Sequence, residues 1–480
     1  LIHAEKCEEW ETACNIALNA AKDAWRSYAS EETSEMLEKC LADVAHINRN
    51  AALLKINSLL LRAELEKHQA RYETTLKTLK EIHVLCAEIQ DAEHDAKASL
   101  DESVTYSHLG QYHDAQNILE IVLQNARTNN DLKTEASALR LMGANYYRFG
   151  EYHRALECHF AANEITKKID GKEKPTDSGH IGETYRMLGE YDKALEYATR
   201  ALELARQSDD RVEMCYQFGN TGLVYYALGK YMPMKEYLEQ GLAIAEAIGN
   251  RSEQTAMLGR IGLAYHAMGD CTTALKYFEQ SLTLAKATSD KLREAEQTNN
   301  IGAIYSELGD RPRALEYLKH SLTIKEEIGS RAGQASTLIN IGDNLTLAGE
   351  YKNALEYYNR SLEIANATGN HNFRIIGYTN GASAYRLAGE LGHAREWLEK
   401  ANAVLQENDD PSTRAEFLRE FGMFEEAEAL TKNNNERTEH IRLAQKYIKQ
   451  AEQIFREIKH QPKADKCAAE LARMKKSYAF

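Results

Sequence analysis

A glycine recurs at almost constant spacing through most of this chain, and this limits the possible folds more than any other feature. The step is forty residues, with one step of thirty-nine between Gly150 and Gly189. A fixed period of this length is the signature of stacked helical or mixed units, each of which contacts only its neighbours. The hinge glycines, as we call them, are Gly110, Gly150, Gly189, Gly229, Gly269, Gly309, Gly349 and Gly389.

Each unit carries further residues at fixed distances from its hinge glycine. Before Gly309 these are a small residue, Gly302, and a tyrosine, Tyr305; after it come Ala314 and Tyr317. A glycine within a helix costs about 1 kcal/mol relative to alanine, so its recurrence implies a packing need. Small residues on both helices let the two backbones approach closely. We therefore expect an all-α fold, a right-handed superhelical solenoid of stacked antiparallel helix pairs.

The two ends of the chain depart from the pattern. Residues 1–50 contain two helical patterns without a hinge glycine, which predicts a degenerate N-terminal repeat or cap. Residues 51–406 are expected to form about nine repeats, and Ala70 takes the hinge place in the first of them. Residues 407–480 predict a degenerate helix pair followed by a capping helix that begins near Pro462.

Composition excludes several classes of protein. The formal net charge of −14 argues against general nucleic-acid binding. The eight cysteines are scattered without a CxxC pair, which favours neither a disulfide framework nor a zinc site and points to a reducing compartment, the cytoplasm. No apolar run is long enough for a membrane span, and no signal-peptide pattern opens the chain.

Signals of catalysis are weak. The chain has no P-loop, GxSxG, HExxH or DxDxDG pattern. His153 and His159 flank Cys158 on one expected helix, but a spacing of six residues does not place the two histidines on one face. We therefore expect neither an enzyme nor a bound metal or cofactor.

The order small residue, tyrosine, hinge glycine, alanine and aromatic resembles the tetratricopeptide repeat. Thr298 stands where that repeat usually has a tryptophan in its first helix, and the usual terminal proline is missing. The forty-residue version is similar to the arrays of Pins/LGN-type adaptors and to the sensor arrays of STAND-type signalling ATPases. The resemblance covers about residues 55–405 and implies a helical solenoid that binds proteins.

Asparagine recurs two residues before the small residue of the first helix. It occupies this place at Asn220, Asn300, Asn340 and Asn380, and Arg260 takes the same place in another unit. An apolar packing position would not select asparagine repeatedly. Because its side chain has a donor and an acceptor, a row of asparagines on the concave face can hydrogen-bond an extended peptide, as the resemblance also implies. The alternative is a local role, in which each asparagine bonds within its own repeat.

Arginine and aromatic residues stand near these asparagines on the first helices. Arginine recognises carboxylates bidentately, so arginines gathered along one groove of an acidic protein suggest an acidic partner peptide. The alternative is a solvated helix face with pairing between neighbouring turns. The candidates are Arg140, Arg148, Arg186, Arg260 and Arg386, together with Tyr147, Tyr226 and His266 in the adjacent outward position.

These patterns favour a scaffold or adaptor that holds a segment of a partner protein in the concave groove, without catalysis. The alternative is a ligand-sensing module of a larger signalling protein, such as a STAND ATPase or a protease-linked receptor. The array fills the whole chain, and the first residue is leucine rather than methionine, so a fragment or processed form is expected. Neither hypothesis indicates an oligomeric state.

Overall fold

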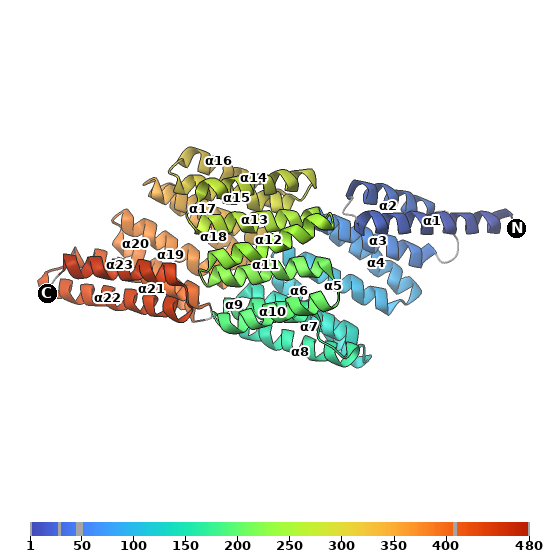
Figure 1. The fold of residues 1–480 in the computed structure, drawn as a ribbon, viewed down its shortest axis with the longest axis horizontal. Helices are drawn as coiled ribbons and strands as arrows, with labels where there is room; N and C mark the ends of the chain where they lie inside the picture. Colours follow the sequence, from blue (N-terminus) through green and yellow to red (C-terminus); the bar gives the residue numbers. More distant parts are fainter. Residues whose placement is uncertain (1, 27–29, 45–50, 407–409, 479–480) are drawn as a thin grey trace.

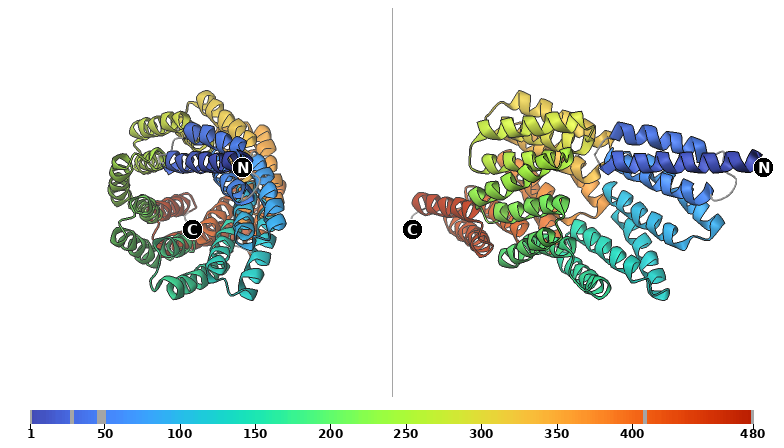
Figure 2. Two further views of the ribbon diagram at one scale, coloured as in Figure 1. Left: turned by 90° about the vertical axis from the view of Figure 1, so that its right-hand side faces the viewer. Right: turned by 45° about the vertical axis from the view of Figure 1, so that its right-hand side comes forward.

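The chain forms a solenoid of stacked antiparallel helix pairs, which confirms the all-α fold (Figure 1). The computed structural model describes residues 2–26, 30–44, 51–406 and 410–478, and within these ranges there are helices and no strand. Seen from its right-hand side, the molecule shows its helices in a ring-like arrangement (Figure 2, left). The expected boundaries near residues 50 and 407 lie outside the described residues, so the division into three regions stays a prediction.

The odd-numbered helices up to α21 are the first helices of their pairs. Their bounds are α1 (Ile2–Arg26), α3 (Ala51–His68), α5 (Ala92–His108), α7 (Leu132–Phe149), α9 (Pro175–Met187), α11 (Arg211–Ala227), α13 (Arg251–Ala267), α15 (Lys291–Glu307), α17 (Arg331–Leu347), α19 (His371–Leu387) and α21 (Pro411–Ala429).

The even-numbered helices are the second helices, and α23 follows the last pair. Their bounds are α2 (Ser30–Val44), α4 (Tyr72–Ile89), α6 (Tyr112–Thr128), α8 (Tyr152–Asp170), α10 (Tyr191–Gln207), α12 (Tyr231–Ala247), α14 (Cys271–Ala287), α16 (Arg311–Glu327), α18 (Tyr351–Thr368), α20 (Leu391–Leu405), α22 (Asn434–Glu457) and α23 (Gln461–Ser477).

The hinge positions join the two helices of a pair through a left-handed backbone conformation. The hinge glycines have φ values between 67° and 89°, a region that glycine enters without a steric penalty. Ala70, expected in the hinge place of an earlier pair, has φ 55°. Side chains cap the next helix: the Asn250 Oδ1 accepts from the backbone N–H of Glu253 at 3.0 Å. Turns thus join both the two helices of a pair and one pair to the next.

Close helix packing within a pair follows the predicted pattern. A Cβ added to Gly302 would lie 2.8 Å from the Leu318 side chain and 3.2 Å from the carbonyl oxygen of Ala314, so only glycine fits there. The rings of Tyr305 and Tyr317 stack beside this contact with centroids 5.5 Å apart. The two helices of each pair are thus held by small residues at the contact and aromatic residues around it.

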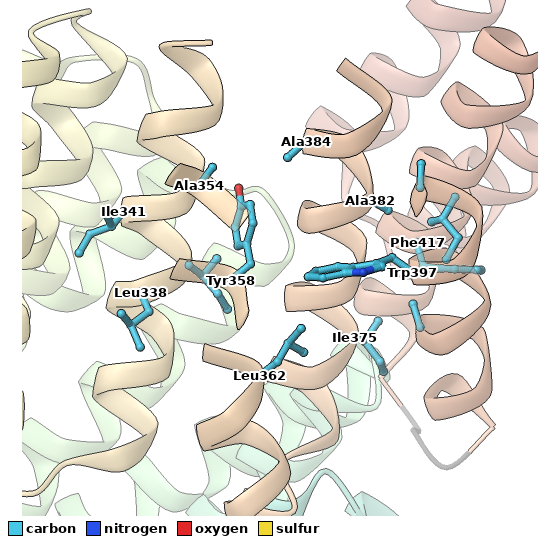
Figure 3. Packing of buried hydrophobic residues seen from close by; sticks show 14 of the residues in the cluster. Leu338, Ile341, Ala354, Tyr358, Leu362, Ile375, Ala382, Ala384, Trp397 and Phe417 are labelled. Atoms are coloured by element: carbon cyan, nitrogen blue, oxygen red, sulfur yellow. The ribbon is translucent and has the colours of Figure 1, made fainter. Parts of the chain in front are cut away.

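The largest hydrophobic cluster runs through successive pairs from α16 to α21. In Figure 3, Tyr358 projects from α18 toward α19, which carries Ala382 and Ala384. Trp397 of α20 packs on α19 where a Cβ added to Gly381 would lie 2.1 Å from its ring. Because each pair buries its apolar face against the next, the core is continuous along the array rather than central.

Successive turns of the superhelix touch each other, which the repeat pattern does not predict. A Cβ added to Gly110 would lie 2.9 Å from the Cβ of Arg331. The Asn370 side chain donates to the backbone carbonyl of Arg148 at 3.1 Å. We call these contacts the seam; it joins residues that are more than two hundred positions apart in the chain.

The C-terminal helices extend the seam. The hydrophobic cluster of α21, α22 and α23 includes Tyr191 of α10 and Val224 of α11. Lys459, just after α22, forms an ion pair of 2.6 Å with Asp192. The last helix begins at the predicted place, with Pro462 in its first turn and near the hinge Gly229. These helices therefore pack against pairs from an earlier turn as well as against their own neighbours.

Candidate functional site

First helices of successive pairs line a cavity of about 550 Å³, which we call the basic cavity. One wall comes from the first helices α13, α15 and α17. The opposite wall comes from the previous superhelical turn, at the ends of α5 and α7 and the starts of α4 and α6. Residues from this earlier turn are Tyr72, Ser107, His108, Tyr112 and Arg148.

The charged residues of the basic cavity are mostly positive. Arg148, Arg260, Arg293 and Lys325 line it, against a single carboxylate, Glu296. The carboxylate is already engaged, because it forms an ion pair of 2.9 Å with Arg293. Burial and the nearby Arg148 lower the pKa of the lining residue His108 to about 4, so this imidazole adds no charge at neutral pH. The cavity therefore holds an excess of positive charge within an acidic protein.

Arg260 lies across the backbone of the preceding pair. A Cβ added to Gly219 would come within 1.6 Å of its guanidinium, so the absence of a side chain there makes room for it. Burial and the neighbouring Arg293 lower the pKa of Arg260 below its ordinary value. No described carboxylate forms an ion pair with Arg260. Glu253 and Glu183 favour the charged form of Arg260 from a distance, but neither forms a direct ion pair with it.

Lys325 reaches the same cavity from α16. Its side chain is 4% exposed, and the Nζ donates to the Thr337 hydroxyl at 2.7 Å. The hydroxyl in turn donates to the Asn299 Oδ1 at 3.1 Å. Burial lowers the pKa of Lys325 to about 8, since a charged ammonium is disfavoured away from water. Lys325 enters no ion pair with a described residue, so a bound anion would stabilise its charged form.

The four asparagines of the predicted row all donate hydrogen bonds inside the chain. Asn220 and Asn300 donate to glutamine side chains three residues earlier, at 3.5 and 3.3 Å. Asn340 donates to the Asn299 Oδ1 at 3.1 Å, and Asn380 donates to the Asp343 Oδ1 at 2.9 Å. Asn220 and Asn300 thus bond within their own repeats, as in the local alternative, whereas Asn340 and Asn380 bond to the preceding repeat. Asn300 alone of the four lines the basic cavity, so binding by the row stays a prediction.

The predicted arginines fall into two groups. Arg148 and Arg260 line the basic cavity, whereas the other three contact protein groups. Arg140 pairs with Asp177 at 2.7 Å, and Arg386 pairs with Glu420 at 2.7 Å. Arg186 donates to the Tyr147 hydroxyl at 3.1 Å. Arg140, Arg186 and Arg386 thus join successive pairs, through partners more than thirty positions away rather than the pairing within one helix considered above.

The aromatic candidates lie away from the basic cavity. Tyr147 contacts the ring of Tyr152, with centroids 5.6 Å apart, besides its bond with an arginine. Tyr226 is 39% exposed and lies beside the ring of Tyr231. His266 lies 2.9 Å from a carboxylate oxygen of Glu307. None of these three aromatic candidates lines the basic cavity, and their proposed contact with a partner stays a prediction.

Sequence reasoning missed Arg293 and Lys325, although the repeat carried a signal for the lysine. Lys325 stands sixteen residues after its hinge glycine. The same place is alanine in neighbouring units, at Ala245, Ala285 and Ala365, all of them buried. A lysine at a buried alanine position is energetically unfavourable unless the site needs it. Aligning the repeats and looking for a charged residue at a position that is alanine in the other units would have identified Lys325.

Two further observations concern the described residues. No group of three or more histidine, cysteine, aspartate or glutamate side chains among them is arranged to hold a metal ion. None of the helices in the described ranges combines the length and apolar character that crossing a lipid bilayer requires.

Comparison with curated proteins finds no match. Among solved structures, the apo form of the quorum sensor NprR from B. thuringiensis is 15% identical with a TM-score of 0.46, covering 67% of this chain and 98% of that one. Aspartyl phosphate phosphatase F from Bacillus subtilis is 15% identical with a TM-score of 0.43, covering 84% and 94%. BtubC from P. vanneervenii is 18% identical with a TM-score of 0.38, covering 46% and 91%.

A family match covers more than half of the chain. The tetratricopeptide repeat family matches residues 134–207, 175–247, 252–327 and 333–407. These segments contain seven of the eight hinge glycines, from Gly150 to Gly389, with the small residues and helix pairs around them. The chain therefore belongs to the tetratricopeptide repeat family.

Proposed function

We propose that the chain is a protein-interaction scaffold that holds an acidic segment of a partner protein in the basic cavity. Arrays of stacked helix pairs act through the extended concave surfaces that they create, and membership of the tetratricopeptide repeat family supports this role. The main observation in favour of an acidic partner is the presence of Arg260 and Lys325 in this cavity. Arg260 is half-buried and Lys325 is buried in one cavity, and neither forms an ion pair with a carboxylate of the described residues.

Burial of an unpaired charge is unfavourable, and an incoming carboxylate would relieve it. Charge-assisted hydrogen bonds are about twice as strong as neutral ones, and a guanidinium can hold both oxygens of one carboxylate. Lys325 adds a point charge from α16, the second helix of the next pair, and Arg148 adds one from the earlier turn. A segment that carries aspartate or glutamate therefore matches the cavity in charge, and a basic segment does not.

Asn300 supplies the uncharged contact. Its side chain lines the same cavity as Arg260, and it is tied only to Gln297 of its own helix, at 3.3 Å. An amide group can meet the backbone of an extended segment as donor and as acceptor. Arg260 and Lys325 would then select acidic side chains of the segment, and Asn300 would hydrogen-bond its backbone between them.

The test is fluorescence anisotropy with two labelled peptides of equal length, one rich in aspartate and glutamate and one rich in lysine. The acidic peptide should bind the wild-type chain, and its affinity should fall as salt is added. Arg260→Gln should weaken binding about tenfold or more, because a charged hydrogen bond contributes roughly 1.5–3 kcal/mol.

The matched control is Arg251→Gln. Arg251 is an exposed residue at the start of the same helix, and it does not line the basic cavity. This variant should bind the acidic peptide as the wild type does. Equal loss of affinity in both variants, or failure of the acidic peptide to bind the wild-type chain, would refute the proposal.

A further inference from the structure

A second cavity, of about 570 Å³, lies farther along the array and shares no residue with the basic cavity. It lies between α17, α18, α19, α21 and α23. We call it the Asp343 cavity, after the carboxylate that α17 places in its wall. The helix α17 contributes to both cavities, through Ser336 to the basic one and through Asp343 to this one.

Asp343 is held by two neutral donors. Its Oδ1 accepts from the Tyr358 hydroxyl at 2.6 Å and from the Asn380 side-chain amide at 2.9 Å. These two bonds fix the orientation of the carboxylate. Burial raises the pKa of Asp343 to about 6, and the two hydrogen bonds oppose this shift. Asp343 is therefore ionised at neutral pH, in a site where its charge is disfavoured.

The other carboxylates of this wall are paired with cations. Glu420 pairs with Arg386 at 2.7 Å, and Glu416 lies 3.0 Å from Lys463. Of the two basic residues in the wall, Arg419 bonds to both carboxylate oxygens of Glu470. Lys466 is exposed, and no described contact joins it to Asp343. Asp343 is thus the one carboxylate of the wall that no cation of the described chain neutralises.

A second polar group of the wall also lacks a partner. Thr379 is 6% exposed, and its hydroxyl makes no hydrogen bond with a described residue. A buried hydroxyl without a partner is unfavourable, and a ligand that hydrogen-bonds to it would relieve this cost. Thr379 is the neighbour of Asn380 in α19, so the free hydroxyl comes from the helix that also donates to Asp343.

Part of the wall is apolar and partly exposed. Leu347 is 63% exposed and Leu387 is 49% exposed, and both line this cavity together with Ile375 and Ile376. Apolar side chains gathered beside polar groups in one cavity are typical of ligand-binding surfaces. Lysine and arginine carry a long aliphatic stem below a charged end, and such side chains place the stem on apolar surface.

We propose that the Asp343 cavity binds the side chain of a lysine or arginine of a partner protein, with its charged end on Asp343 and Thr379 and its stem on the leucines. The carboxylate supplies the opposite charge, the threonine hydroxyl accepts a further hydrogen bond, and the apolar wall contacts the methylene groups. The site is separate from the basic cavity, and the two can be tested independently.

The test is ligand-observed NMR with lysine, arginine and norleucine, each capped at both ends so that only the side chain differs. Capped lysine and capped arginine should bind the wild-type chain, in the millimolar range. Norleucine keeps most of the aliphatic stem without the charge, and it should bind at least about fivefold more weakly. Asp343→Asn should weaken the binding of lysine about tenfold, and Thr379→Val by about threefold.

The matched control is Asp209→Asn, which makes the same chemical change at an exposed carboxylate that lies outside both cavities. It should bind capped lysine as the wild type does. Thermal melting of Asp343→Asn checks the fold, and loss of a buried charge should leave the melting temperature unchanged or higher. Failure of lysine and arginine to bind, equal binding of norleucine, or wild-type binding by Asp343→Asn would overturn the proposal.

Discussion

The Asn372 side chain donates a hydrogen bond of 2.8 Å to the Tyr152 hydroxyl, although 220 residues separate the two. Asn372 lies in the first turn of α19 in one superhelical turn, and Tyr152 begins α8 in the turn before. Together with the contact of Gly110 with Arg331 and the ion pair of Lys459 with Asp192, this bond makes the seam a repeated feature. The basic cavity lies beside the seam, so the seam positions its two walls.

The first prediction concerns the seam. Gly110→Ala should lower the free energy of unfolding by about 2–4 kcal/mol, because the new Cβ is strained at positive φ and also meets Arg331. Gly269 has a similar φ, but a Cβ there would meet nothing within 4 Å. Gly269→Ala should therefore lose only about 1–2 kcal/mol, from backbone strain. Urea denaturation measures both values, and equal losses would show that the seam contributes no stability.

A second prediction concerns packing within a pair. Gly302→Ala should destabilise the chain by about 1–3 kcal/mol, since its Cβ would press on Leu318. Gly392 is also helical, but it has open space around its Cβ position. Gly392→Ala should be neutral or stabilising by up to about 1 kcal/mol, because alanine favours the helix. Thermal or chemical unfolding should therefore show that Gly302→Ala lowers the stability and that Gly392→Ala does not. If both variants are destabilised, the proposed contact of Gly302 with Leu318 is not the cause.

The third prediction follows from the pKa of Lys325. The folded chain releases this proton near pH 8, below the ordinary lysine value of 10.5, so the unfolded chain binds the proton more strongly. Stability should therefore rise as the pH increases from about 8 toward 10.5. At neutral pH the buried charge destabilises the fold, and Lys325→Met should stabilise it by roughly 3 kcal/mol.

The control for this prediction is Lys319→Met, on an exposed lysine of the same helix. It should leave both the stability and its pH dependence unchanged. Unfolding curves at several pH values provide the measurement. A pH dependence in Lys325→Met like that of the wild type would show that this lysine is not the group responsible.

Much of the fold could be predicted because the residue spacing within each repeat determines how its two helices pack. Gly302, Ala314 and Tyr317 occupy their places through local contacts within one pair, and such contacts follow from spacing alone. The seam is different: the contact of Asn372 with Tyr152 depends on small rotations that accumulate over several pairs. No spacing within one repeat encodes that sum, so the seam required the structure.

In the candidate site, too, some residues could be predicted from the repeat pattern and others could not. Arg260 and Asn300 were predicted from their recurring place, and the structure puts both at the basic cavity. Lys325 and Asp343 were missed, although each departs from the residues at the same place in neighbouring units, such as Ala285 and Leu263. Arg148 was predicted from its helix, but its contribution to this cavity arises only because the previous turn closes over it.

The most direct test of the acidic-segment proposal is the affinity for the acidic peptide between about pH 7 and about pH 9, where Lys325 loses its proton. Only a ligand inside the basic cavity would sense this buried group. The wild-type chain should bind roughly tenfold more weakly at the higher pH, and Lys325→Met should bind more weakly at neutral pH and change little with pH. The same pH dependence in both proteins would contradict the proposal that the acidic segment occupies the basic cavity.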